Sequence, residues 1–294
     1  MRVSDPTGSH PGPIGSHTKT SGGLAKAALP YADAAGSEAV QVYVSNSRGW
    51  ALPPGDPKQD TLFRDGCGER GLPAYIHASL LVNVGSPTEQ TVTRSVETLE
   101  HALRRGAAIG AKAVVYHAGS SVDPSHDEKA LRQLGEALLP LLDTAAAQGL
   151  PRLLVEPSAG GGRSLASKMQ DLGPYLAAVE HHPWLGVCFD TCHAWAAGHD
   201  LATPGGMTAT LDALVAAVGT ERLQLIHAND SKDECGSTRD RHETIGAGRI
   251  GAAPFAELLS HPATAGIPVI VETPSKEHEG HAADIALLKG LRAG

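Results

Sequence analysis

Side chains that can bind metal recur in this chain at the ends of short apolar runs. At or near the ends of six successive runs stand His77, His117, Glu156, Asp190, His227 and Glu272. A lone histidine or glutamate in such a place is usually an ordinary polar residue. Six in the same register are hard to obtain by chance, and three carboxylates buried together cost a large free energy unless cations neutralise them. The pattern therefore predicts a centre that holds several metal ions.

Two further segments add candidate ligands. The segment from Asp190 to His193 places a carboxylate and an imidazole around one turn, and Asp240 and His242 flank Arg241. Residues two apart in an extended backbone point the same way, so Asp240 and His242 can hold one ion together. With His193 they would form a shell of two histidines and one aspartate, which is the ligand chemistry of a catalytic zinc with an open position.

The four cysteines do not extend this set. Cys67, Cys188, Cys192 and Cys235 form no disulfide framework, and we interpret them as reduced thiols. Cys188 and Cys192 flank Asp190, but without a second cysteine pair we expect them to be small buried thiols and not ligands. No apolar run approaches the ~20 residues that a membrane helix needs, and the start of the chain lacks a signal core. A cytoplasmic location with no membrane association is expected.

The elements that must position the ligands alternate along the chain. Eight β-branched runs are predicted as strands, at residues 13–17, 39–46, 74–80, 112–117, 152–156, 185–190, 222–229 and 268–272. Helical patterns separate nearly all of them, most clearly at 87–106 and 127–148. This alternation predicts an α/β fold, a single-domain (β/α)₈ TIM barrel over residues 13–294, after a flexible tail at 1–12. An open doubly wound sheet is the competing fold, and the absence of a Gly-x-Gly-x-x-Gly after the first strand weakens it. In a barrel all strand ends face one mouth, so the ligands would converge there.

Five motifs carry a resemblance to a known family. They are Ile14-Gly15-Ser16-His17 with Gly22-Gly23-Leu24, the segment from Val115 to Ser120, the segment from Gly186 to His193, Asp240-Arg241-His242 followed by Gly246 to Gly251, and Val271-Glu272-Thr273. With these motifs the chain resembles the endonuclease IV family of apurinic/apyrimidinic-site endonucleases, which are xylose isomerase-like TIM barrels. The likeness runs from Ile14 nearly to the C-terminus.

The resemblance implies a zinc-dependent DNA repair enzyme with three Zn²⁺ per chain. His77 and His117 would bind the first ion, Asp190, His227 and Glu272 the second, with Glu156 bridging the two and a hydroxide, and His193, Asp240 and His242 would bind the third. The implied substrate is double-stranded DNA with an abasic or 3′-blocked site. Hydrolysis on the 5′ side of an abasic site would leave a 3′-hydroxyl and a 5′-deoxyribose phosphate.

The segments that would probe the DNA depart from the family pattern. Arg48 matches one probe, but the residue after it is Gly49 and not a longer polar side chain. Leu80 stands where the family has an aromatic probe, and leucine can wedge between base steps but cannot stack like a ring. Arg241, between two candidate ligands, is a third expected DNA contact. The formal net charge of −8 excludes a broad basic surface, so binding should depend on a local face and on DNA deformation.

Two other functions remain open at this point. A metal-dependent sugar isomerase or epimerase of the xylose isomerase-like type would need only Glu156, Asp190, His227 and Glu272, and would leave five candidate ligands without a role. A damaged-DNA binding protein that does not cleave would fit the altered probes but not a complete ligand set. We expect a monomer, because no interface pattern stands out in the sequence.

Overall fold

The computed structural model describes residues 12–293, in which strands and helices alternate along the chain. The barrel strands are β1 (Ile14–His17), β2 (Val40–Val42), β3 (Ala74–His77), β4 (Ala113–His117), β5 (Arg152–Glu156), β6 (Leu185–Asp190), β7 (Leu223–His227) and β10 (Val269–Val271). The helices are α1 (Leu24–Ala35), α2 (Pro57–Arg70), α3 (Glu89–Ile109), α4 (Asp127–Gln148), α5 (Leu172–Ala178), α6 (Thr191–Ala196), α7 (Gly206–Val218), α8 (Ala253–Ser260) and α9 (His278–Ala293).

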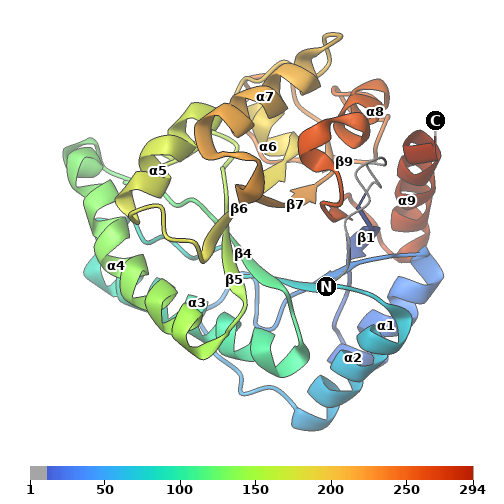
Figure 1. Ribbon diagram of the computed structural model, residues 1–294, viewed down its shortest axis with the longest axis horizontal. Helices are drawn as coiled ribbons and strands as arrows, with labels where there is room; N and C mark the ends of the chain where they lie inside the picture. The colour runs from blue at the N-terminus through green and yellow to red at the C-terminus, as the bar shows by residue number, and fades with distance from the viewer. Residues whose placement is uncertain (1–11, 294) are drawn as a thin grey trace, which may run out of the picture.

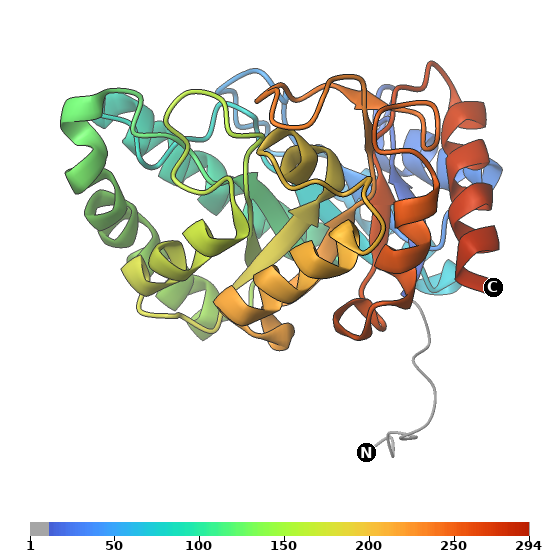
Figure 2. The same cartoon turned by 90° about the horizontal axis from the view of Figure 1, so that it is seen from above.

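The eight strands close on themselves, and every neighbouring pair is parallel. Their order around the barrel is β1-β10-β7-β6-β5-β4-β3-β2, so the first and last strands complete the ring. The helices form an outer layer around the strands, and α9 packs beside α1 where the ring closes (Figures 1 and 2). The predicted single-domain (β/α)₈ barrel is therefore confirmed.

The alternation of side chains along the strands explains how the fold positions a site. One buried cluster takes a single residue from most strands: Ala39, Tyr75, Ala113, Val115, Leu154, Cys188, Leu225 and Ile270. Intervening residues such as Ile76 and Val114 belong to the larger cluster beneath the helices. Successive side chains point to opposite faces of a strand, so the small cluster fills the barrel interior. Two residues beyond Tyr75, Leu154 and Ile270, the same face carries His77, Glu156 and Glu272.

Several element boundaries differ from the predicted ones. The strand expected at 74–80 ends at His77, because Ser79 and Leu80 leave the barrel and bond to the backbone of the loop after β2. The strand expected at 39–46 is shorter, and α3 runs to Ile109. The predicted tail lies outside the described residues except for Gly12, which is buried. Within 12–293, no helix combines the length and apolarity needed to cross a membrane.

Candidate metal centre

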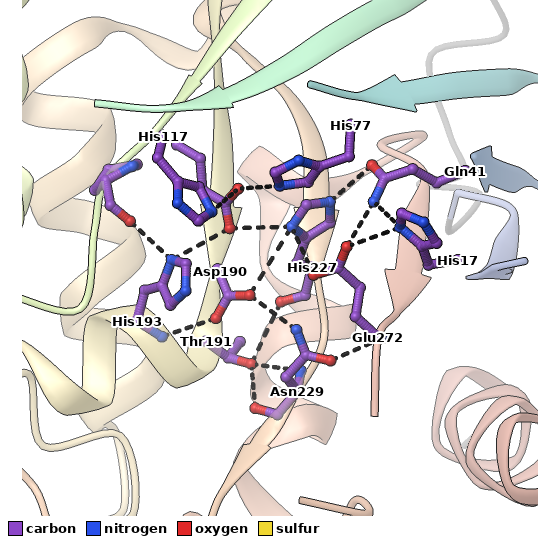
Figure 3. Close-up of polar contacts among 12 residues, drawn as sticks. His17, Gln41, His77, His117, Asp190, Thr191, His193, His227, Asn229 and Glu272 are labelled. Atoms are coloured by element: carbon purple, nitrogen blue, oxygen red, sulfur yellow. Dashed lines mark hydrogen bonds and ion pairs between the residues drawn. The ribbon is translucent and has the colours of Figure 1, made fainter. Parts of the chain in front are cut away.

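The six predicted strand-end side chains meet at one mouth of the barrel. His77, His117, Glu156, Asp190 and His227 are the last residues of β3, β4, β5, β6 and β7, and Glu272 follows β10 directly. Glu156, Asp190 and His227 are at most 2% exposed. His193 joins them from α6, and Asp240 and His242 come from the segment that contains β9 (His242–Glu243). All nine sequence-predicted ligands therefore surround one site. Figure 3 labels His77, His117, Asp190, His193, His227 and Glu272 among them.

Glu156 lies at the centre of this site with its two oxygens turned to different partners. Oε2 is 3.3 Å from His77 Nε2 and 3.6 Å from His117 Nε2. Oε1 is 3.1 Å from His227 Nδ1 and 3.2 Å from His193 Nδ1. A carboxylate held in this way can bridge two cations, one on each side.

The remaining ligands form two further groups within binding distance. Glu272 Oε2 is 3.3 Å and Asp190 Oδ2 is 3.9 Å from His227 Nδ1, so one ion could contact all three side chains. In the other group, Asp240 Oδ2 lies 3.3 Å from His193 Nε2 and Asp240 Oδ1 lies 3.0 Å from His242 Nε2. The ligand atoms of His77, His117 and Glu156, those of Asp190, His227 and Glu272, and those of Asp190, His193 and His242 each lie within 4.8 Å of one another.

Local structure explains how the loop ligands are placed. Asp190 caps α6: its Oδ1 accepts a hydrogen bond from His193 N at 2.8 Å, so one turn carries a carboxylate and an imidazole toward neighbouring positions. His242 is carried by a two-stranded hairpin in which β9 pairs with β8 (Asp230–Ser231). Arg241 between the two hairpin ligands is exposed and forms an ion pair with Asp233.

Burial and the mutual charges of carboxylates and imidazoles shift the pKa values at the centre. Burial opposes ionisation of Glu156, but His227 and His193 outweigh it and hold the pKa of that carboxyl well below its usual range. Burial likewise disfavours protonation of His193, yet Asp190, Glu156 and Asp240 raise its pKa well above the usual value. Burial lowers the pKa of His117 to about 4. A metal ion bound to His193 would have to displace the proton that this raised pKa favours.

Four of the five candidate histidine ligands also place a ring nitrogen near an oxygen that is not itself a candidate ligand atom. His77 Nδ1 lies 2.8 Å from Ala78 O, His193 Nδ1 lies 3.0 Å from Pro157 O, and His242 Nδ1 lies 3.2 Å from Glu272 O. His227 Nε2 lies 3.0 Å from Gln41 Oε1. Partners of this kind fix the tautomer and the ring orientation of metal-binding histidines.

Sequence reasoning missed three side chains that contact the centre. His17 Nδ1 lies 3.2 Å from Glu272 Oε1, Gln41 bonds to both of them and to His227, and Asn229 Nδ2 donates to Asp190 Oδ2 at 2.8 Å. A signal existed for two of them. The pattern of polar side chains at strand ends extends to β1 and β2, because His17 is the last residue of β1 and Gln41 is its register partner on β2.

The predicted DNA-probing residues lie next to each other on the rim. Leu80 N donates to Ser47 O at 2.8 Å, and Ser79 Oγ donates to Ser47 O and Gly49 O, so the loops that carry Arg48 and Leu80 are joined. Arg48 is exposed, and Leu80 is 39% exposed and lines the cavity over the metal centre. Leu80 can therefore contact a molecule seated in this mouth, and Arg48 is exposed on the loop that is bonded to the Leu80 segment.

Comparison with known proteins agrees with this geometry. Residues 29–291 match the family described as xylose isomerase-like TIM barrel. A protein of Streptomyces coelicolor named probable endonuclease 4 is 55% identical over 282 residues, which cover 96% of each chain. The crystal structure of endonuclease IV from Thermus thermophilus has a TM-score of 0.81 at 34% identity, covering 95% of this chain and 98% of that one. A D-tagatose 3-epimerase-like protein has a TM-score of 0.74 at 18% identity over 95% of this chain and 96% of that one, which is a likeness of fold alone.

Proposed function

The chain belongs to the endonuclease IV family, and from this premise we propose that it hydrolyses the phosphodiester on the 5′ side of abasic sites in double-stranded DNA. The products would be a 3′-hydroxyl and a 5′-deoxyribose phosphate, and the same site would remove blocking groups from 3′ ends. One observation carries the proposal: the Glu156 carboxylate turns one oxygen to His77 and His117 and the other to His193 and His227.

The donor set fits three zinc ions. Within residues 12–293, Glu156, Asp190, Asp240 and Glu272 form ion pairs with histidines and with no lysine or arginine. Four carboxylates so close together need more positive charge than neutral imidazoles supply, and oxygen and imidazole nitrogen are zinc ligands. We assign His77 and His117 to one ion, Asp190, His227 and Glu272 to a second with Glu156 shared, and His193, Asp240 and His242 to the third.

Residues of the protein would position the metal ions and the phosphate relative to each other. Zinc ions, when bound, supply an activated water at neutral pH, charge neutralisation on the phosphate and stabilisation of the leaving oxygen. Glu156 would fix the spacing of the first two ions, which decides where a phosphate can sit. The carbonyl oxygens of Ala78 and Pro157 lie within hydrogen-bonding distance of His77 and His193 and would hold their rings in place for an ion. No side-chain nucleophile is needed.

The rim residues would read the lesion. Arg48, Leu80 and Arg241 are the proposed DNA contacts, and Leu80 would wedge apolar surface into the strand opposite or beside the abasic site. We expect Leu80→Ala to lower kcat/KM for abasic duplex about tenfold, which corresponds to ~1.4 kcal/mol, and Leu80→Tyr to restore or exceed the original value because a ring can stack on a base. Equal zinc content in the three proteins is the control. Unchanged incision by Leu80→Ala would remove this residue from the lesion contact.

The two alternative functions predict different results. Glu156, Asp190, His227 and Glu272 alone would serve a sugar isomerase or epimerase, but the geometry also gathers five more ligands that such a reaction leaves unused. A protein that binds damaged DNA without cleaving it would bind abasic duplex and leave it intact.

One set of measurements decides among these functions. We would quantify zinc per chain and assay incision of duplexes with an abasic site, a 3′-phosphate or no lesion, with and without chelator, beside a panel of ketoses. Incision that the chelator abolishes is the expected result. Turnover of sugars alone, or binding without incision, would overturn the proposal. Because the proposed substrate is DNA, we expect the protein to act on nucleoid DNA in the cytoplasm. We also expect it to sediment as a monomer and to be fully active in that form.

A further inference from the structure

A buried glutamine on β2 contacts the metal centre without being able to serve as one of its ordinary ligands. Gln41 has no exposed surface, and its side chain lies between His227, Glu272 and His17 (Figure 3). A buried amide that lacks partners costs ~1–3 kcal/mol, so a glutamine in this place must be matched by its neighbours. All of its side-chain partners belong to the mouth of the barrel.

The contacts of His227 determine how this amide is oriented. His227 Nδ1 faces three carboxylate oxygens, from Glu156, Glu272 and Asp190, at 3.1, 3.3 and 3.9 Å. A metal-binding nitrogen carries no proton, so Nε2 must be the protonated nitrogen and needs an acceptor. Gln41 Oε1 lies 3.0 Å from Nε2 and is that acceptor.

Once its oxygen is assigned, the amide nitrogen of Gln41 can only donate to the opposite side. It donates to Glu272 Oε1 at 2.6 Å and lies 2.9 Å from His17 Nδ1. The other oxygen of Glu272, Oε2, is the one turned to His227 Nδ1. The orientation of one amide thus determines which nitrogen of His227 and which oxygen of Glu272 remain free to bind an ion. Both residues are proposed ligands of the same ion.

A second buried amide complements the first. Asn229, also without exposed surface, donates from Nδ2 to Asp190 Oδ2 at 2.8 Å and accepts from the backbone N–H of Glu272 at 2.8 Å. Together the two amides contact Asp190, His227 and Glu272, the three ligands that we assign to the second ion alone. Gln41 is the one that contacts two of these ligands through their side chains.

We propose that Gln41 is a positioning residue for the second ion, which presents the Nδ1 nitrogen of His227 and the Oε2 oxygen of Glu272 to it. This inference rests on the proposed zinc centre and adds to it a residue outside the ligand set. Changes in such outer partners typically weaken metal binding 10–100-fold.

The test compares zinc affinity in Gln41→Glu, Gln41→Met and a matched control. Gln41→Glu keeps the shape and the acceptor for His227 but sets an oxygen against Glu272, and Gln41→Met keeps the volume and removes both bonds. Gln59→Glu is the control, because Gln59 Oε1 accepts hydrogen bonds from the backbone of α1 and contacts no ligand. Each chain is stripped of metal, checked for folding by circular dichroism, and titrated with zinc in competition with a chromophoric chelator.

We expect one of three zinc ions to bind 10–100-fold more weakly in both Gln41 variants, and all three to bind normally in Gln59→Glu. Wild-type affinity for all three ions in either folded Gln41 variant would overturn the inference while the proposed function stands. If the wild-type chain itself holds fewer than two zinc ions, the proposed function fails instead. Should Gln41→Met not fold, the isosteric Gln41→Glu carries the comparison.

Discussion

Two groups of buried carboxylates in this barrel are neutralised in different ways. On the flank, Asp60 of α2 forms a bidentate pair with Arg105 of α3, with distances of 2.5 and 2.6 Å. At the mouth, Glu156 and Asp190 are equally buried, but their charged neighbours in the described chain are imidazoles. The flank pair carries its own cation and therefore holds two helices together. At the mouth no lysine or arginine of the described chain pairs with these two carboxylates, and we propose that metal ions supply the missing positive charge.

Asp230 represents a third arrangement. It is fully buried and accepts five backbone N–H groups, from Ser231, Gly246, Gly248, Ile250 and Gly251, at 2.7–3.2 Å. Its charge is spread over peptide dipoles, so it needs neither an arginine nor a metal. The type of partner thus separates carboxylates that stabilise the fold from the carboxylates that we propose as metal ligands.

Replacing the central mouth carboxylate should have the largest effect. Glu156→Gln keeps the shape but removes the charge that we propose two ions share, so we expect incision of abasic duplex to fall roughly 10³-fold or more, equivalent to ~4 kcal/mol of lost transition-state stabilisation. Zinc per chain should fall in the same protein. Steady-state incision and metal analysis measure the two effects, and full activity in Glu156→Gln would contradict the bridging role.

Replacing the flank carboxylate by an amide should lower the free energy of unfolding and leave the zinc content unchanged. Asp60→Asn leaves Arg105 buried beside a neutral partner, and breaking a buried pair in this way costs ~3 kcal/mol of unfolding free energy. Urea unfolding of the zinc-free proteins measures this loss. Zinc stoichiometry should equal that of the unchanged chain. Loss of zinc from a folded Asp60→Asn protein would mean that flank and mouth are not separable.

A substitution in the loop that surrounds Asp230 should have a smaller effect, which comes from a steric clash. A Cβ on Gly248 would collide with Asp230 Oδ1 and with the Ser231 carbonyl oxygen. Gly248→Ala should therefore destabilise the protein by about 2 kcal/mol, because the tightly packed loop must move. Gly68→Ala is the matched control, since Gly68 lies in the last turn of α2 and nothing lies within 4 Å of a Cβ built on it. Thermal unfolding should separate the two variants, and equal melting temperatures would show that the loop is free to adapt.

The three kinds of carboxylate differ in how far sequence could reveal them. The position of the proposed strand-end ligands was predictable because side chains alternate along a strand, which brings the same face of every strand to the mouth. The pairing of Asp60 with Arg105 joins residues 45 positions apart on two helices, and no local pattern encodes it. The glycine-rich motif at 246–251 could be recognised in the sequence, but its partner Asp230 could not be predicted. Nothing in the local sequence distinguishes this aspartate from others that follow a strand. Gln41 and Asn229 were missed because an amide in a strand signals no chemistry until its neighbours are known.

A carboxylate with cation partners at the surface should show the smallest effect and a defined pH dependence. Glu38 lies before β2 and meets Arg292 and Lys289 of α9 at 2.7 and 3.0 Å, while Ile14 N donates to it at 3.0 Å. Burial raises the pKa of Glu38, but Arg292, the Ile14 amide and Lys289 outweigh it and lower the pKa to about 2.

Because the pKa of Glu38 is lower in the folded than in the unfolded chain, its contribution to stability is present above the unfolded pKa of about 4.5 and is lost as pH falls toward 2. The group is about a third exposed, so we expect Glu38→Gln to cost only ~0.5–1 kcal/mol at pH 7. Urea unfolding of the zinc-free proteins between pH 7 and pH 3 should show this difference shrinking below pH 4.5. A difference that stays constant down to pH 3 would mean that Glu38 acts through packing and not through its charge, which would place it outside the group of cation-paired carboxylates.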